Sequence, residues 1–507
     1  MIHYIIFKVT PSWCEFLSML RNIKLRIVIL SFPLLACLAS CSGGGSGGDA
    51  SVFVPKSEGI EAASPKTYVI KNSQDSEAIQ SALDAVSPGD KIIIRAGSNS
   101  FSSDYRLAGE SLRGFTLSTS GTAEKPIYII GESSENEGRP VIDQGKTASH
   151  DSNAVGENLE PTAGLYLQCV SYVVIENLEI RNTHLAGITS SLGGCKSSNI
   201  TIVNSHIHHV YGDRNVAGIR MSGVSDITIK NNELHDIYQV NSDQASPVFF
   251  STIEPVQNVE IENNQFSDIH TGIRLEGQND KSLSALTIKS NHFERLTTAI
   301  KGVIRSTDDE TMATGRILQL NISDNLLINL MQGVDIDAGD SQSQSETLSL
   351  YNNTFYNINN VAISLSAVSS TELYNNIFSH ISRDLLISRA PVNTSLTHTF
   401  SLYDHNLYWA ADYDDATGPK WLLDLEGSDQ QLFVSMDSWR IAYTSTAHQQ
   451  LNSDPDQDST FTNPLFVDAG NNDFRPTASL ALSGGRQGHA LGAFRDGNVP
   501  GIQTLNE

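Results

Sequence analysis

The sequence predicts an all-β fold: a right-handed parallel β-helix, a three-sheet solenoid, with an N-terminal capping helix and a C-terminal cap. The first observation is a recurring phrase of an apolar residue, any residue, and then Asn or a similar polar residue. It begins at Ile175, Ile202, Ile229, Ile261, Ile288, Ile322, Leu350, Leu373 and Leu402. The shortest interval runs from Leu350 to Leu373 and the longest from Ile288 to Ile322. Such a period predicts a stack of similar units.

Two further columns accompany this phrase. Directly after it runs a column of asparagines: Asn232, Asn264, Asn291, Asn325, Asn353 and Asn376. Before most phrases stands a third strand-like run, in which Gly or Ala precedes an apolar residue, at 187–189, 218–220, 272–274, 299–301, 333–335 and 362–364. Three short strands per repeat, with like residues stacking, suit a parallel β-helix, because each coil buries its apolar side chains only against its neighbours.

The alternatives to a β-helix fit the pattern less well. The runs alternate with a period of two and are rich in Ile, Val, Thr and Asn, which disfavours helical repeats. A β-propeller would need about forty residues per blade. An Asn column inside a turn can also hydrogen-bond its amides up and down the stack, which satisfies polar groups that would otherwise be buried without partners.

We expect a β-helix domain at residues 66–411 and a C-terminal cap at 412–507. Asp75–Val86 reads as an amphipathic helix that covers the open first coil, whose edge is otherwise unpaired. Early strands are expected at 91–95 and 126–130. Aromatic residues gather where the repeat fades, at Tyr403, Tyr408, Trp409, Trp421, Trp439 and Tyr443. They predict a cap that packs on the last coil.

The N-terminus reads as an export signal over residues 1–40, with the start at Met19. Basic residues precede an apolar run at 27–38, which is too short to span a bilayer. The run ends in Leu-Ala-Ser-Cys41, which resembles a bacterial lipobox and implies lipidation of Cys41. Residues 41–65 would then be a lipidated flexible tether. By resemblance to lipoprotein sorting, the Ser that follows Cys41 indicates an anchor at the outer membrane or cell surface, and a location on the periplasmic face is not excluded by it. The alternative is an ordinary cleaved signal peptide.

The composition limits the classes of partner. The chain has 507 residues, of which 57 are acidic and 33 basic, so its net charge is −24 at pH 7. This balance argues against nucleic-acid binding, because phosphates would be repelled over most of the surface. An anionic substrate would therefore need a locally basic groove. We expect a monomer.

Cys169 and Cys195 are separated by close to one repeat of the sequence. They would then stack in adjacent coils, where neighbouring strands lie about 4.8 Å apart. A disulfide accepts such a separation and is typical of exported proteins. The sequence leaves open a disulfide or two stacked thiols.

Several segments resemble secreted bacterial β-helix polysaccharide-degrading proteins, a set that includes alginate, chondroitin and pectate lyases. The matching segments are 89–94, 120–127, 139–143, 463–468, 473–476 and 491–494. The resemblance covers most of residues 66–496 and specifies architecture better than activity. The Arg-His-Gly motif of alginate and chondroitin lyases is absent, as are the Asp-Pro-His-Asp motif of alginate epimerases and the Gly-Asp-Asp motif of polygalacturonases.

The resemblance also implies where a site would lie. In such lyases the Asn column lies in the turn after the second sheet. The third strand-like runs, such as Gly-Ile-Arg at 218–220 and 272–274, would then belong to the first sheet, along which the substrate cleft runs. The apolar residue of each run points inward and its neighbour outward. The outward column reads Thr189, Arg220, an uncertain coil near Phe250, Arg274, Lys301, Asp335 and Ser364.

Within this column, Arg274 and Lys301 are the expected catalytic pair. Cleavage of a uronate polymer by β-elimination needs a base to take the proton at carbon 5 and a cation to neutralise the carboxylate. A Lys beside an Arg can serve as the base. We therefore expect Lys301 to be the base and Arg274 the carboxylate clamp. The alternative is that both are solvated strand residues bridging to Glu276 and Asp335.

Three carboxylates on the same face invite other interpretations. Glu276, Asp335 and Asp337 could hold calcium, which prefers hard oxygen ligands. Asp335 and Asp337 stand about 7 Å apart on one strand, which also fits the pair of an inverting glycosidase. In a chain this acidic they could equally be solvated surface groups.

Other residues complete the prediction. Arg220, Tyr211, His270 and Arg305 are expected to contact substrate, with Tyr211 and His270 as reserve candidates for proton transfer. The histidines His206, His208 and His235 follow the repeat spacing away from the first sheet, so the sequence argues against zinc there. Three functions stay open: a polysaccharide lyase, a glycoside hydrolase using Asp335 and Asp337, and a polysaccharide-binding or adhesive lipoprotein without catalysis.

Overall fold

The structure is a computed structural model. It describes residues 64–71, 75–105, 112–146, 161–190, 194–240, 242, 244–277, 281–304, 315–337, 345–366, 368–389, 399–410, 420–425, 429–433, 435, 437–440, 456–494 and 500–501. These residues belong to a compact unit, Ala63–Glu507. The predicted signal peptide, residues 41–63 of the tether with Cys41, and Arg305 lie outside the described residues.

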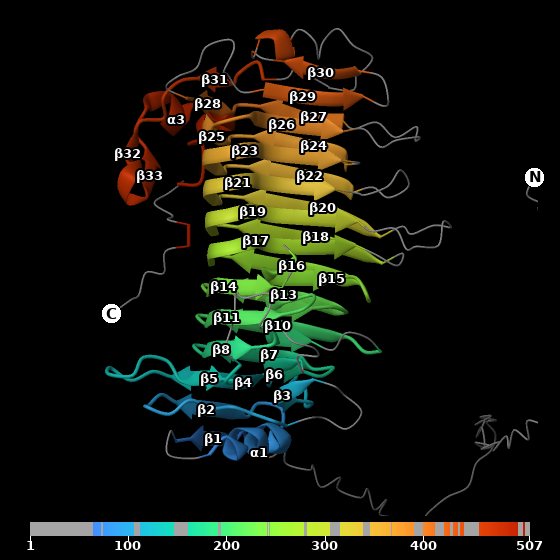
Figure 1. The fold of residues 1–507 in the computed structure, drawn as a ribbon, viewed down its shortest axis with the longest axis vertical. Helices are drawn as coiled ribbons and strands as arrows, with labels where there is room; N and C mark the ends of the chain where they lie inside the picture. Colours follow the sequence, from blue (N-terminus) through green and yellow to red (C-terminus); the bar gives the residue numbers. More distant parts are fainter. Residues whose placement is uncertain are drawn as a thin grey trace, which may run out of the picture. The chain divides into compact units, whose positions relative to one another are not determined.

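The chain winds as a right-handed parallel β-helix, as predicted (Figure 1). Most coils contribute to three sheets. The second sheet has twelve parallel strands: β1 (Thr67–Ile70), β2 (Lys91–Arg95), β4 (Ile127–Glu132), β7 (Ser171–Glu176), β10 (Ser197–Val203), β13 (Val224–Lys230), β16 (Val256–Glu262), β18 (Ser282–Lys289), β20 (Arg316–Ser323), β22 (Ser345–Tyr351), β24 (Val368–Tyr374) and β27 (Thr399–Asp404).

The first and third sheets are joined by four long strands that pass through both: β17 (Gln265–Gly277), β19 (His292–Ile304), β21 (Leu326–Asp337) and β23 (Thr354–Ser366). The third sheet also contains β5 (Val141–Asp143), β8 (Glu179–Thr183), β11 (His206–Gly212), β14 (Glu233–Gln239), β25 (Ile377–Ile381), β28 (Leu407–Trp409) and β31 (Thr460–Phe461). The first sheet also contains β3 (Arg113–Leu117), β6 (Thr162–Leu167), β9 (Leu185–Ser190), β12 (Ala217–Met221), β15 (Ser246–Ser251), β26 (Asp384–Arg389) and β29 (Lys420–Leu425). Strand β30 (Asp429–Phe433) pairs antiparallel with β29.

The asparagine column forms the ladder that the sequence predicts. The side-chain oxygen of Asn325 accepts from the backbone N–H of Asn291 at 2.9 Å and from its side-chain nitrogen at 3.1 Å. Asn291 in turn accepts the same two bonds from Asn264. The structure extends the ladder by one coil to Asn406, which the sequence-based prediction missed. The residue before each ladder position has a left-handed backbone, with φ of 54° at Asn263, which explains the preference for Asn there.

The core consists of inward-facing aliphatic and aromatic columns. Phe266 stacks on Phe293 at a ring-centroid distance of 4.9 Å, and Phe355 stacks on Phe378 at 4.8 Å. All four are at most 1% exposed. Each coil therefore completes the core of the next, which is the source of stability in a stacked-repeat fold.

The N-terminal end is closed as expected. Helix α1 (Glu77–Ala85) lies beside β1 at the N-terminal end of the solenoid, below β2 (Figure 1), and buries Ile79 and Leu83 to 1% exposure. No helix among the described residues is long and apolar enough to cross a membrane.

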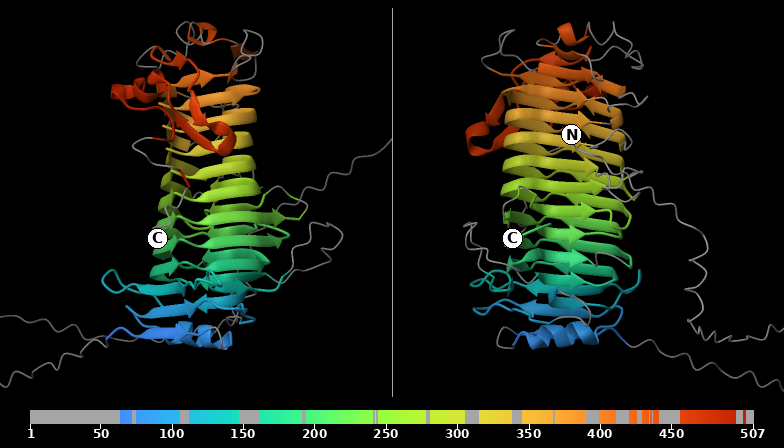
Figure 2. Two further views of the ribbon diagram at one scale, coloured as in Figure 1. Left: turned by 90° about the vertical axis from the view of Figure 1, so that its left-hand side faces the viewer. Right: turned by 45° about the vertical axis from the view of Figure 1, so that its right-hand side comes forward.

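The C-terminal end differs from the expected boundary. The parallel ladder continues past residue 411, because β29 pairs with β26 and β31 with β28. Trp421 and Trp439 are buried at this end, as expected of a cap. The following elements lie beside the third sheet instead (Figures 1 and 2): β32 (Phe466–Asp468), η2 (Ala469–Asn471), β33 (Asp473–Pro476), α3 (Ser479–Ser483) and η3 (Arg486–Gly488). The reason is that Leu326 and Ile328 point outward and are covered there by Phe474.

Cys169 and Cys195 form a disulfide between adjacent coils, with a Cα–Cα distance of 5.5 Å. Of the two possibilities that the sequence left open, the structure contains the bonded form. The repeat register explains it, because Ser171 and Ser198, which follow these cysteines, are paired across β7 and β10.

Candidate functional site

The outward column of the first sheet has the register that the sequence predicts. Thr189 pairs with Arg220, Arg274 with Lys301, and Lys301 with Asp335. The coil that the sequence left uncertain contributes Phe249, which stands between Arg220 and Arg274. The strand neighbours of these residues, such as Ile273, face the core, so the column lies on the outer face of the sheet.

Arg274 is buried rather than solvated. One of its terminal nitrogens lies 2.6 Å from a carboxylate oxygen of Glu276, and the two side chains are 4% and 8% exposed. The other terminal nitrogen donates to the backbone oxygen of Gln244 at 3.0 Å. The guanidinium also lies 4.9 Å from the ring centre of Phe249. Arg274 is therefore held by the protein on three sides.

Arg220 is the other buried arginine of the column. It is 6% exposed, and its Nε is buried without a hydrogen-bond partner among the residues that the structure describes. Its guanidinium lies 6.0 Å from the ring centre of Phe249, on which Arg274 also packs. Burial lowers the pKa of Arg220 to about 10, although the negative charge of Glu276 opposes this shift. Arg220 thus stays cationic at neutral pH and retains a donor to offer.

Lys301 is the most accessible of the three cations. Its side chain is 40% exposed, and its Nζ lies 3.8 Å from a carboxylate oxygen of Asp335. The column thus contains the two ion pairs of the alternative interpretation, Arg274 with Glu276 and Lys301 with Asp335. Arg220 and Lys301 are three strand spacings apart, or about 14 Å, so they would contact different sugars of one polymer.

The expected calcium ligands are not brought together. Val303 stands between Glu276 and Asp337 in the register, so these two are separated by about 10 Å, whereas oxygens sharing one calcium lie within about 5 Å of each other. Within the described ranges, Glu276, Asp335 and Asp337 do not form a group of convergent metal-ligand atoms. This trio therefore does not have the geometry of a calcium site.

Tyr211 and His270, the reserve candidates for proton transfer, lie outside the arginine column. Tyr211 is 7% exposed, and its ring contacts His184 edge-on at a centroid distance of 4.4 Å. Burial raises the pKa of Tyr211, which suits a proton donor better than a base. His270 is half-buried in β17, just before the strand enters the first sheet.

The structure places together three histidines for which the sequence argued against a metal. Ring nitrogens of His206, His208 and His235 lie within 4.8 Å of one another. Burial, and then the neighbouring His208 and His235, lower the pKa of His206 to about 3. The signal in the sequence was the His-x-His spacing in one coil, with a further histidine one repeat after His208.

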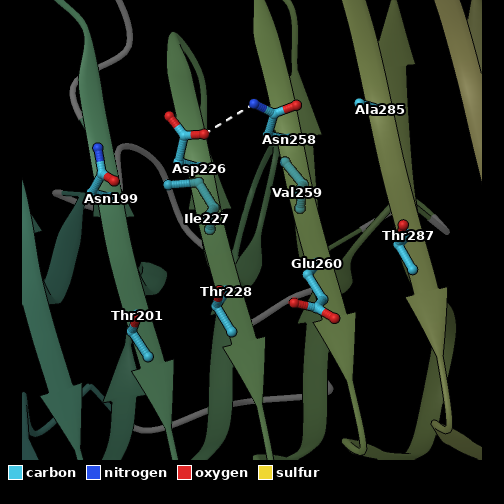
Figure 3. A pocket seen from close by; sticks show the side chains of 10 residues that line it. All are labelled: Asn199, Thr201, Asp226, Ile227, Thr228, Asn258, Val259, Glu260, Ala285 and Thr287. Carbon is cyan, nitrogen blue, oxygen red and sulfur yellow. Dashed lines mark hydrogen bonds between the residues drawn. The ribbon is translucent and has the colours of Figure 1, made fainter.

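A shallow groove of about 570 Å³ crosses the outer face of the second sheet (Figure 3). It is lined by Asn199, Thr201, Asp226, Ile227, Thr228, Asn258, Val259, Glu260, Ala285 and Thr287. Asn258 donates to Asp226 at 3.0 Å across it. None of the predicted site residues lines this groove, and its lining contains no cation, so it offers less chemistry than the arginine column.

Comparisons with known proteins agree with the fold. The family described as a right handed beta helix region matches residues 149–388, just under half of the chain. No curated protein matches.

Among solved structures, the chain is similar to the family 28 exopolygalacturonase of Yersinia enterocolitica, with a TM-score of 0.45 and 14% identity over 73% of this chain and 78% of that one. It is similar to a rhamnogalacturonan lyase, with a TM-score of 0.44 and 12% identity over 81% and 99%. It is also similar to the alginate lyase of Paenibacillus sp. strain FPU-7, with a TM-score of 0.41 and 14% identity over 71% and 98%. At these identities the likeness concerns the fold.

Proposed function

We propose that this protein binds an acidic, uronate-containing polysaccharide along the outer face of the first sheet and cleaves it by β-elimination. The observation that carries the proposal is Arg220, a buried guanidinium whose Nε has no hydrogen-bond partner among the described residues. A buried donor without a partner costs about 1–3 kcal/mol. A carboxylate from a bound uronate would satisfy it, and a guanidinium suits that ligand because it can donate two parallel hydrogen bonds.

The register of the column supports a polymer rather than a small anion. Arg220, Arg274 and Lys301 lie at equivalent positions of successive coils apart from the intervening Phe249. Cations repeated along one face suit a chain that carries a carboxylate on successive sugars. The whole protein is strongly acidic, so this column provides the local positive charge that such a chain would need.

The cleavage step is assigned to Lys301. Its neutral amine would take the proton from carbon 5, and the released electron pair would form the double bond between carbons 4 and 5. The glycosidic oxygen at carbon 4 would leave with its bonding pair and take a proton from water or from the ammonium group that Lys301 has become. Arg274 would neutralise the sugar carboxylate during this step if that carboxylate replaced Glu276 beside it. Asp335, 3.8 Å from Lys301, would orient the amine.

A lipid anchor at Cys41 and a place at the outer membrane or cell surface form part of this proposal, as does a monomeric state. The Cys169–Cys195 disulfide supports export, because disulfides persist in oxidising compartments. Calcium stays in the proposal as a cofactor that would bridge protein and polymer carboxylates, rather than one held by the protein trio alone.

A second candidate is a polysaccharide-binding protein without catalysis. The two ion pairs favour it, because Glu276 already occupies Arg274 and Asp335 already faces Lys301. A binding protein would need only the open donor of Arg220 and the exposed ammonium of Lys301.

The test is ultraviolet absorbance over time, with the purified protein and calcium against alginate, pectate and chondroitin-type polymers. Rising absorbance, from the unsaturated uronate, is expected on one of them. A flat trace with measurable binding would move the assignment to the binding protein, and a flat trace with new reducing ends would indicate a hydrolase.

Two substitutions separate chemistry from binding. Lys301→Ala is expected to lower kcat by about 10²–10⁴-fold, the usual contribution of a general base, while keeping most of the binding. Arg220→Gln is expected to raise KM with a smaller effect on kcat. Lys289→Ala is the matched control, because this lysine pairs with Glu260 on the second sheet, and it should change neither constant. Unaltered turnover in Lys301→Ala would remove Lys301 from the mechanism.

A further inference from the structure

The three clustered histidines come from two neighbouring strands of the third sheet. His206 and His208 are two residues apart on β11, and His235 on β14 is the direct partner of His208. The intervening Ile207 is fully buried, so the histidines point away from the core. The stack thus places three imidazoles on one outward patch.

The ring nitrogens already lie near the spacing of a metal site. The Nε2 atoms of His206 and His235 are 2.7 Å apart, and ligand nitrogens of all three rings lie within 4.8 Å. Four ligands around zinc, each at about 2.0–2.1 Å from the ion, stand about 3.3 Å from one another. Rotamer adjustments of about 1 Å would therefore bring the three nitrogens to that spacing.

The hydrogen bonds of His235 fix which of its nitrogens is available. Its Nδ1 lies 2.6 Å from a carboxylate oxygen of Asp236, whose other oxygen accepts from the hydroxyl of Tyr238 at 2.6 Å. A carboxylate only accepts, so Nδ1 of His235 carries the proton and Nε2 presents a lone pair. A carboxylate that holds a histidine in this way is the usual support of a metal ligand.

The close contact between the Nε2 atoms of His206 and His235 then shows which of the two rings donates a hydrogen bond. His235 presents a lone pair, so His206 must donate a proton to it across the 2.7 Å contact. A metal ion would take the place of this shared proton. The proton would move to Nδ1 of His206, which leaves both Nε2 lone pairs for the ion and keeps both rings neutral.

Carboxylates lie close to the three histidines, which suits a cation. Glu179 on β8 lies 3.3 Å from Nε2 of His208 and is paired with Arg181 at 2.8 Å. Glu179 and Asp236 therefore place two carboxylates beside the three rings. The side chains of His208 and His235 are 10% and 21% exposed, so the patch is partly accessible and a water could complete the coordination.

We propose that His206, His208 and His235 bind one divalent transition-metal ion of the zinc type, which ties two successive coils together. Neutral imidazoles favour zinc, copper and nickel over calcium and magnesium, which prefer oxygen ligands. The site is on the third sheet and is independent of the polysaccharide face. A second group, Asp404, His405 and Asp458, is less suited because an oxygen of Asp404 already accepts two backbone N–H groups.

The test uses the purified full chain, stripped with a chelator and titrated with Zn²⁺ by calorimetry. One Zn²⁺ per chain is expected, together with a higher melting temperature, because a ligand that binds only the folded state stabilises it. Co²⁺ in its place should give the visible absorption of a nitrogen-coordinated ion, and excess Ca²⁺ should not displace either.

Variants locate the ion. His206→Ala and His235→Ala should each weaken Zn²⁺ binding at least tenfold, and Asp236→Asn should weaken it by about 10–100-fold through the orientation of His235. His405→Ala is the matched control and should leave binding unchanged. Melting in chelator shows whether each variant folds, and Asp236→Asn reports on the site if a histidine variant does not. Absence of Zn²⁺ binding, or binding that survives His206→Ala and His235→Ala, would overturn the proposal.

Discussion

The buried pair of Arg274 and Glu276 gives the sharpest prediction about the arginine column. Arg274→Met removes a guanidinium that lies 2.6 Å from the Glu276 carboxylate, in a pair whose side chains are 4% and 8% exposed. It removes the cation that pairs with this buried carboxylate, and breaking such a pair costs about 3–5 kcal/mol. Replacing both partners, as Arg274→Met with Glu276→Leu, removes both charges and is expected to restore most of the stability.

The control is an ion pair of equally good geometry on the surface. Arg295 makes two bonds of 2.7 Å to Asp268 on the preceding coil, but these side chains are 50% and 49% exposed. Arg295→Met should therefore cost no more than about 1 kcal/mol. Equilibrium urea unfolding followed by far-ultraviolet circular dichroism gives the free energy of unfolding for each variant, and a double-mutant cycle isolates the pair.

The outcome also bears on function. If Arg274→Met costs no more than Arg295→Met, or if the double variant is as unstable as Arg274→Met, the argument from burial is wrong. A stable double variant that still cleaves polysaccharide would make Arg274 a structural residue. A stable double variant that binds polymer but no longer cleaves it would keep Arg274 as the carboxylate clamp.

Two further predictions concern the scaffold. Asn291→Ala removes an acceptor of the Asn264 backbone N–H and a donor to a strand carbonyl, both at 2.9 Å, and should lower the free energy of unfolding by about 2–6 kcal/mol. Among the described residues, Asn357 makes only an exposed side-chain bond, to Asn329, so Asn357→Ala should cost about 1 kcal/mol by urea unfolding, chiefly because it loses a favourable left-handed residue. Equal effects of the two substitutions would contradict the ladder argument. Burial raises the pKa of Asp456 to about 7, so the folded state holds its proton more tightly than the unfolded state. The stability that this proton contributes is therefore complete below pH 4 and is lost as the pH rises to 7. The melting temperature of the unaltered protein should fall across this range for that reason, and the melting temperature of Asp456→Asn should lack this contribution to the fall.

The fold could be predicted because stacking makes the sequence repeat visible. Each ladder asparagine bonds to the next coil, so the residue type recurs at the repeat interval. The same register brings Cys169 and Cys195 within 5.5 Å. The fold-back of the C-terminal segment was not predicted, because its cause is a local one: outward-facing Leu326 and Ile328 need cover.

The column of the first sheet could be predicted in its order but not in its environment. Alternation along each strand places Arg220, Arg274 and Lys301 outward. Whether an outward residue is solvated depends on the connecting loops, whose length differs from coil to coil. Gln244, in the connection before β15, covers Arg274, and Phe249 separates the two arginines. Neither contact follows from the spacing, so the burial of Arg274 was missed.

The histidines show that the same regularity supports a second interpretation. Repeat spacing argues against zinc at His206, His208 and His235 when it is read from the sequence alone, since a repeated residue type suggests a structural column. In a stacked fold, however, repeat spacing is what brings side chains of adjacent coils into contact. An outward residue, the residue two positions later and the residue one repeat later always meet on the surface, whatever their chemistry. When all three are able to bind a metal, as they are here within 4.8 Å, the spacing favours a site.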